Sequence, residues 1–236
     1  LKEKYPNCKV YVPSPKLLKK LFEAYQDNWS SWNNPFENAK TIFDNNPYVD
    51  AYVDDVKGEI FHDHYRVYDE NKTDIPLVEQ MLKFWQFEEN KYTDSRPELY
   101  FSDSEKELGD KIIEEHTDGE FGALVISDRY DYSNDNLIID ILKENPIPYF
   151  YYSPVPLEQT SFNFIDKALD IRNMDMRLQL YIRSKAKINI GNQSGALQLV
   201  VRESNVFDVQ RQFPIAGNFV KGEKYLKDDF KRNLLK

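Results

Sequence analysis

The segment KINIGNQSGALQLVVRESNVFDV, residues 187–209, decides the fold class. It begins with a short apolar strand over 187–190, which a glycine-bracketed turn over 191–195 ends. A helix over 196–203 and a second apolar strand over 205–209 follow. A strand that leads through a helix to another strand is typical of a parallel sheet. The segment therefore predicts an α/β protein.

The same alternation extends upstream through the second half of the chain. It rests on apolar residues at helical spacing and on proline or asparagine at the ends of elements. The predicted elements are strands at 121–126, 148–152 and 168–171, and helices at 133–145, 157–167 and 175–185. Strands and helices that alternate at this pace indicate one parallel sheet covered by helices.

The first half of the chain is less regular. The predicted elements are strands at 9–12, 48–53 and 59–65, a helix after Pro15, a helix opened by Pro76, and a helix capped by Ser102 and Asp103. Proline favours the first turn of a helix, and serine and aspartate favour its N-cap. We predict two domains, 1–95 and 96–236, both Rossmann-like.

Composition excludes several classes of function. The chain carries 31 Lys and Arg against 40 Asp and Glu, a net charge of −9, which disfavours binding to nucleic acid. Cys8 is the single cysteine, so an internal disulfide and a zinc site built on thiolates are both excluded. We find no apolar run of about 20 residues and no signal peptide. We therefore expect a cytoplasmic protein without an integral membrane segment.

The turn over 191–195 is the strongest candidate for ligand binding. The backbone N–H groups at the start of the following helix, with the positive end of its dipole, form a seat for phosphate. Ser194 adds a hydroxyl donor, and Gly195 lets a ligand approach the backbone. The alternative is an ordinary strand-to-helix turn with a serine cap.

The same segment resembles the signature of the lipopolysaccharide heptosyltransferase family, glycosyltransferase family 9. The family pattern Gly-Asn-Asp-Ser-Gly-Pro-x-His-Leu-Ala aligns with residues 191–200, which keep its glycines, asparagine, serine and leucine. The sequence departs from the pattern at Gln193, Ala196, Gln198 and Val200. Weaker resemblances, in the same order along the chain, cover 1–10, 46–53, 169–174 and 184–186.

The resemblance implies a glycosyltransferase B-type fold with the nucleotide sugar held mainly by the second domain. It implies that Ser194, Gly195 and Ala196, with Gln193 beside them, contact the diphosphate of the donor, and that Met174 lies near the nucleobase. It also implies that the family's first strand and the glycine-aspartate loop that supplies the catalytic base would lie before Leu1. We therefore expect the first domain to be incomplete at its N-terminus.

Two further places carry candidate site residues. Arg129 follows the 121–126 strand, at the edge where open α/β sheets bind ligands, so it is a candidate diphosphate partner; a solvated surface arginine is the alternative. In the predicted strand over 59–65, His62 and His64 share one face and Asp63 points to the other. A metal site would need more ligands, and His116 lies on a polar helix, so we predict no metal. We take His64 and Asp63 as candidate catalytic groups and Arg66 as an acceptor-side residue; a polar strand end is the alternative.

We therefore predict an inverting, metal-independent glycosyltransferase for polysaccharide biosynthesis, of the hexosyl- or heptosyltransferase class. It would transfer a sugar from a nucleotide sugar to a glycan or lipid-linked acceptor, with no cofactor and at most peripheral membrane contact. One alternative is a catalytically inactive relative that binds a nucleotide or glycan, which the departures at Gln193 and Gln198 favour. Another is a sugar-nucleotide epimerase of similar fold. The absence of a dinucleotide fingerprint argues against a dehydrogenase.

Overall fold

The computed structural model describes residues 2, 5–22, 38–55, 80, 96–127, 130, 132–192, 195–210 and 224–225. The described residues divide into two compact units. The first contains those up to residue 55 together with Leu99–Asp103, and the second contains residues 80, 96–98 and the chain from Ser104 onward. The domain boundary that we placed between residues 95 and 96 stays a prediction.

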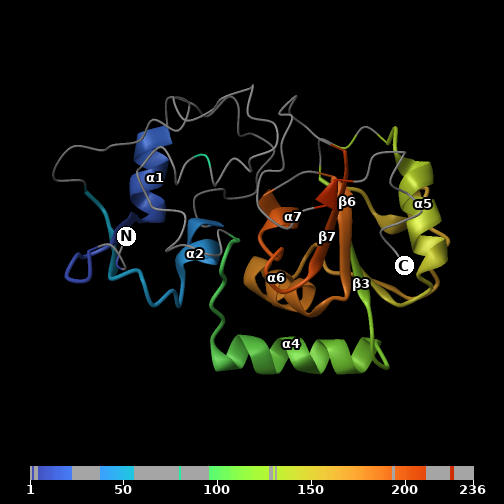
Figure 1. The fold of residues 1–236 in the computed structure, drawn as a ribbon, viewed down its shortest axis with the longest axis horizontal. Helices are drawn as coiled ribbons and strands as arrows, with labels where there is room; N and C mark the ends of the chain where they lie inside the picture. The colour runs from blue at the N-terminus through green and yellow to red at the C-terminus, as the bar shows by residue number, and fades with distance from the viewer. Residues whose placement is uncertain are drawn as a thin grey trace. The chain divides into compact units, whose positions relative to one another are not determined.

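The helices and strands of the first unit are few and short, and those of the second unit are more regular (Figure 1). The first unit contains β1 (Tyr11–Pro13), α1 (Pro15–Phe22), α2 (Asn38–Phe43) and β2 (Ala51–Val53). From α4 onward the chain contains α4 (Asp103–His116), β3 (Gly122–Val125), α5 (Asp135–Glu144), β4 (Tyr149–Tyr152), the 3-10 helix η3 (Leu157–Gln159), β5 (Ala168–Asp170), α6 (Met176–Lys185), β6 (Ile188–Asn192), α7 (Gly195–Gln198), β7 (Asn205–Gln210) and β8 (Lys224–Tyr225).

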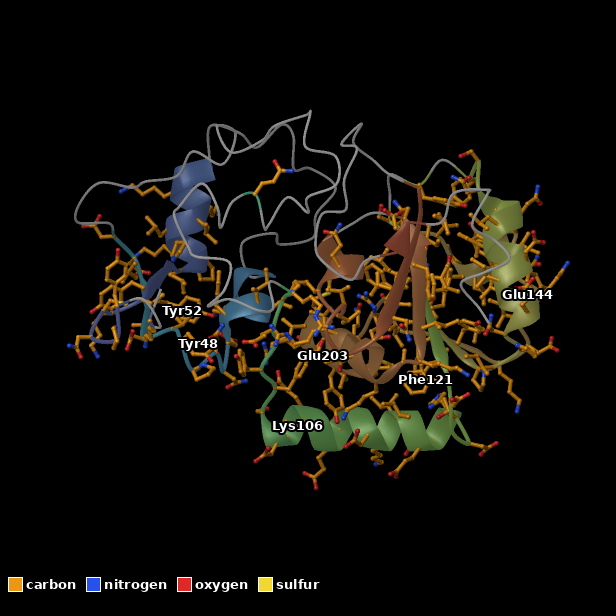
Figure 2. The ribbon with its side chains drawn as sticks, viewed as in Figure 1. Tyr48, Tyr52, Lys106, Phe121, Glu144 and Glu203 are labelled. Carbon is orange, nitrogen blue, oxygen red and sulfur yellow. The ribbon has the colours of Figure 1, made fainter. Side chains whose placement is uncertain are left out.

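In the first unit, β1 and β2 pair in parallel, with Tyr11 opposite Ala51. Ser14 follows β1 and caps α1, because its Oγ accepts a hydrogen bond from Leu17 N at 3.1 Å. The same hydroxyl donates to a carboxylate oxygen of Asp54, just after β2, at 2.6 Å. The end of β1, the start of α1 and the end of β2 are thus joined through one serine. Figure 2 shows Tyr48 and Tyr52 in this unit, and Tyr52 Oη donates to Asp44 Oδ1 at 2.5 Å.

The second unit contains a six-stranded sheet in the order β5-β4-β3-β6-β7-β8. Every neighbouring pair in it is parallel. The predicted parallel sheet over residues 121–209 is therefore confirmed, and it is separate from the β1–β2 pair among the described residues. The register places Val125 of β3 opposite Tyr152 of β4 on one side and Gly191 of β6 on the other.

Helices cover both faces of this sheet. Figure 1 shows α5 on one side of the strands and α6 with α7 on the other. On the α5 side, four helix residues spaced to form one face pack on strand residues with alternating spacing. The buried set includes Leu137, Ile138, Ile141 and Leu142 of α5 and Leu124, Tyr149, Tyr151, Ile188, Ile190 and Phe207 of the strands. This cluster is the main core of the unit.

The helix α6 is buried from Arg177 to Ser184 because the sheet and α4 cover it from different sides. Asp175 caps it, since its carboxylate accepts from Arg177 N at 2.9 Å and from Leu178 N at 3.3 Å. Gly109 lets α4 approach closely: a Cβ there would lie 2.2 Å from the Tyr181 ring. Tyr181 Oη donates to Asp110 Oδ1 at 2.7 Å, and burial together with Asp110 raises the pKa of Tyr181.

Phe121, which Figure 2 labels, follows α4 and packs its ring edge-to-face on that of Phe150, with centroids 5.1 Å apart. His116, the last residue of α4, tilts against the same Phe150 ring at 6.4 Å. The prediction that His116 lies on a polar helix is confirmed. These rings cover the amino-terminal end of β3 and β4.

Three predicted elements were wrong. The helix predicted over 157–167 is only the 3-10 helix Leu157–Gln159 followed by turns. Thr160 explains this, because its Oγ1 donates to Leu157 O at 2.7 Å and accepts from Phe162 N at 3.2 Å. Side-chain bonds of this kind compete with the helical backbone.

The other two errors adjoin each other. Strand β6 continues through Asn192, so residues 191 and 192, which were predicted to begin a turn, belong to the strand. The helix predicted over 196–203 is a single turn, Gly195–Gln198, after which the chain turns toward β7. Val200 and Val201 are buried there, and β-branched residues are stiff at χ1 and favour helix less.

No helix in the described part of the chain is long and apolar enough to span a bilayer.

Candidate functional site

The carboxyl ends of β3 and β6 form the topological switch point of the sheet. The chain runs from β3 outward through β4 to β5, then returns to β6 on the other side of β3. The helix after β3 packs on one face of the sheet, and the helices α6 and α7, before and after β6, lie on the other (Figure 1). Ligands of open α/β sheets bind at the carboxyl edge at such a point, because the connections diverge there.

Two residues join the strands at this point. Asn192, the last residue of β6, is fully buried, and Ser127 lies two residues after the end of β3. Asn192 Oδ1 accepts from Ser127 N at 2.8 Å, and Asn192 Nδ2 donates to Ser127 Oγ at 2.6 Å. The orientation of the carboxamide is fixed because a backbone N–H can only donate. Both segments that leave the switch point therefore start from a fixed position.

Gly191 allows the two strands to approach at this edge. A Cβ on Gly191 would lie 1.9 Å from Val125 O and 2.9 Å from Val125 C. Because these are backbone atoms of β3, no side-chain rotation can relieve the contact. The glycine that the sequence suggested as part of a turn is thus needed inside a strand, for close packing of backbone on backbone.

On the α6 face of the same sheet, Asn189 of β6 joins three segments. Its Nδ2 donates to Arg183 O at 2.9 Å and to Ser204 Oγ at 2.8 Å, and its Oδ1 accepts from Arg183 Nε at 3.3 Å. Arg183 is fully buried, and burial lowers the pKa of its guanidinium to about 10, so it stays charged at neutral pH. Sequence reasoning missed Asn189 and placed Asn192 in the ligand-binding turn rather than in the strand; the signal for both was a polar amide beside an apolar strand.

Few of the predicted site residues are placed by the structure. Gly195 and Ala196 form the start of α7, beside the end of β6. Met174 lies in the loop after β5, also at the carboxyl edge; its carbonyl accepts from Gln179 Nε2 at 2.8 Å and its N–H donates to Ile171 O at 3.0 Å. His64, Asp63, Arg66, Arg129, Gln193 and Ser194 lie outside the described residues. The roles of all of these residues stay predictions.

The seat for phosphate that we predicted is smaller than expected. A helix of one turn carries little of the aligned dipole that a long helix sums at its N-terminus. What distinguishes this place instead is the switch point, where the buried carboxamide of Asn192 holds the ends of β3 and β6 together. Among the described residues no group of three His, Cys, Asp or Glu is placed to hold a metal ion.

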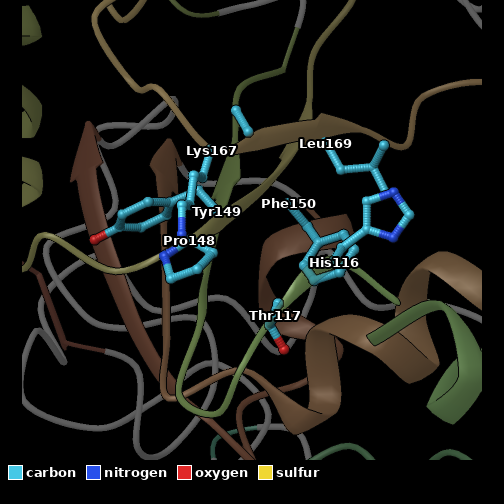
Figure 3. Close-up of a pocket in the computed structure, with 8 residues that line it drawn as sticks. His116, Thr117, Pro148, Tyr149, Phe150, Lys167 and Leu169 are labelled. Atoms are coloured by element: carbon cyan, nitrogen blue, oxygen red, sulfur yellow. The ribbon is translucent and has the colours of Figure 1, made fainter. Parts of the chain in front are cut away.

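A small hollow lies at the opposite edge of the sheet (Figure 3). It has an empty volume of about 250 Å³ and lies between the end of α4 and the first residues of β4 and β5. Its lining residues are His116, Thr117, 148–150 and 167–169. It lies at the amino ends of the strands, so it is not part of the switch-point site.

The sequence matches no protein-family model and no curated protein. Among solved structures, similarity is found to POFUT1. The POFUT1 complex with GDP in crystal form III is 17% identical over 44% of this chain and 44% of its own, with a TM-score of 0.37. The complex with GDP-fucose is 14% identical over 77% of this chain and 68% of its own, with a TM-score of 0.39. A high-resolution complex with GDP is 15% identical over 83% of this chain and 68% of its own, with a TM-score of 0.39.

These are distant resemblances, and this chain spans less than half of the first POFUT1 structure. The resemblance to the heptosyltransferase family, for which no family model matches, stays a prediction.

Proposed function

We propose that this protein is a glycosyltransferase that binds a nucleotide sugar at the carboxyl ends of β3 and β6. The observation that carries the proposal is the switch point joined by Asn192 and Ser127. At such a point an extended ligand lies across the strand ends without meeting a covering helix. Gly195 and Ala196 begin α7 beside this point, and the first backbone N–H groups of a helix have no partner within it, so we propose that they bind the diphosphate.

In the proposed reaction an acceptor hydroxyl displaces the nucleoside diphosphate from the anomeric carbon with inversion. The hydroxyl loses its proton to a base, and the bond to the departing phosphate oxygen breaks. Without a metal, cations and backbone N–H groups would stabilise the charge that develops on the diphosphate. We propose Arg129, Ser194 and Gly195 for that role and His64 or Asp63 as base, with Arg66 toward a glycan or lipid-linked acceptor.

The test starts with binding. Uridine, guanosine, adenosine and cytidine diphosphates are titrated into the protein by calorimetry, and Gly195→Val is compared with the parent. We expect one diphosphate to bind and the valine variant to bind it about tenfold or more weakly, because a side chain there blocks approach to the backbone. His116→Ala, at the opposite edge of the sheet, is the matched control and should bind like the parent.

Release of the diphosphate from the corresponding nucleotide sugars then separates an enzyme from a relative that only binds. If no diphosphate binds, or if Gly195→Val binds as well as the parent, the site is wrong. Tight binding without transfer to any of a panel of glycan and glycolipid acceptors would instead support the inactive relative that the departures at Gln193 and Gln198 suggested.

A further inference from the structure

Among the described residues between β3 and α5, Tyr132 has an unusual backbone conformation. Tyr132 has φ of 61°, in the left-handed region that non-glycine residues rarely adopt. For an L-residue other than glycine, asparagine or aspartate this conformation costs about 1–2 kcal/mol. A large aromatic residue is therefore kept where glycine would be less strained, which calls for an interaction of its ring.

The ring of Tyr132 is supported from one side and open on another. It packs edge-to-face on Tyr130 with centroids 5.0 Å apart and an interplanar angle of 65°. Tyr130 is 5% exposed, belongs to the core, and is itself fixed by a 2.9 Å hydrogen bond from its hydroxyl to Asp135 Oδ1. Tyr132, in contrast, is 42% exposed. A rigid aromatic base thus supports an exposed aromatic ring.

The position of this ring relates to the carboxyl edge of the sheet. Tyr130, on which the ring packs, is tied to the switch point, because Tyr130 N donates to Ser127 O at 3.1 Å. Burial raises the pKa of the Tyr151 phenol in β4. Tyr132 and Asp170 raise it further through smaller electrostatic interactions. Through its ring contact with Tyr130, Tyr132 therefore lies near the segment that leaves the carboxyl end of β3 at the switch point.

The distance between the strand ends matches the length of the ribose and base of a nucleotide. Neighbouring strands are about 4.8 Å apart, so the end of β4 lies roughly 5–10 Å from the ends of β3 and β6. A nucleoside diphosphate whose phosphates occupy the switch point extends its ribose and base across about that distance. An exposed ring there offers a face for stacking, which every base accepts.

We propose that Tyr132 is the platform on which the nucleobase of the donor stacks. This inference rests on the proposed function, because it takes the switch point as the seat of the diphosphate. It assigns Tyr132 a part in nucleotide affinity and none in the transfer of the sugar.

The test compares Tyr132→Phe, Tyr132→Ala and Tyr132→Gly with the parent, using the nucleoside diphosphate that the parent binds and inorganic pyrophosphate as a probe without a base. Stacking on an aromatic side chain is worth about 1–3 kcal/mol, so alanine and glycine should weaken diphosphate binding by roughly five- to 150-fold. Phenylalanine should bind like the parent, and pyrophosphate should compete equally well in all four proteins. The glycine variant should melt no lower than the parent, because its backbone is not strained at this φ.

Nucleoside diphosphate affinity that is unchanged in the glycine variant would overturn the inference and leave the proposed function intact. An equal loss for pyrophosphate would also overturn it, because the ring would then act on the phosphate site. Failure of the parent to bind any nucleoside diphosphate would overturn the proposed function itself.

Discussion

The two parallel sheets of this protein are joined by different kinds of side chain. In the first unit two exposed carboxylates flank β2: Asp50 accepts from Val10 N at 2.7 Å and Asp54 from Ser14 Oγ at 2.6 Å. In the second unit two fully buried carboxamides on β6, Asn189 and Asn192, perform the corresponding task. The difference follows from solvation, since an ion in contact with water costs little while a buried one costs several kcal/mol unless it is paired.

The stability of the two units should therefore be sensitive to different changes. Bonds to a charged group at the surface depend on pH and salt, and each contributes little. Bonds to a buried amide depend on neither, but their loss leaves polar atoms away from water. Mutations in β6 should therefore reduce stability strongly, and mutations around β2 weakly and only in a defined pH range.

The largest effect is expected at Gly191. Gly191→Ala places a Cβ against the backbone of Val125, so β3 and β6 must separate, and we expect a loss of about 3 kcal/mol in the free energy of unfolding. Gly122→Ala is the matched control in the same sheet, because its Cβ would meet the side-chain ring of Tyr149 and not the backbone of a neighbouring strand. Chemical denaturation should give a loss of about 1–2 kcal/mol there. Equal losses at both glycines would contradict the backbone contact.

A smaller loss is expected at Asn189. Asn189→Leu keeps the volume but removes both donated hydrogen bonds and the bond from Arg183 Nε, for an expected loss of about 2–3 kcal/mol. Asn205→Ala is its control, because this asparagine is exposed, and its Nδ2 donates to Lys187 O at 3.2 Å. The control should change the free energy of unfolding by no more than about 0.5 kcal/mol. A neutral Asn189→Leu would show that the buried amide is not structural.

The smallest effect is expected at Asp50. Its hydrogen bonds with Lys2 and Val10 N lower the pKa of the carboxyl from 3.8 to about 2. The folded state is therefore favoured by this group above pH 4, and the contribution is lost as the pH falls toward 2. The melting temperature of Asp50→Asn should lie below that of the parent at pH 5–7 and converge with it near pH 2.

Lys2→Met removes the first of these partners and should reproduce part of the difference at neutral pH. A gap between parent and Asp50→Asn that widens as the pH falls would contradict the sign of this linkage.

Local patterns in the sequence were sufficient for most of the second unit. Apolar spacing predicted α5 and α6, and Asn145 and Asp175 end and begin them as their side-chain chemistry suggests. The 157–167 helix failed because apolar spacing does not show that Thr160 binds its own backbone. Gly191 and Asn192 were assigned to a turn because glycine and asparagine favour turns in isolation.

What the sequence by itself determined is the class of fold: strands and helices alternate, and a parallel sheet is the arrangement that such alternation allows. It also marked the segment after β6 as the place to look for a ligand. What only the tertiary structure decided is the order of the strands, and with it the switch point between β3 and β6. The Asn192–Ser127 pair spans 65 residues, and the Tyr132 ring is placed by a backbone conformation that its residue type disfavours. Neither is written in local spacing, because contacts between distant segments follow from packing of the whole sheet.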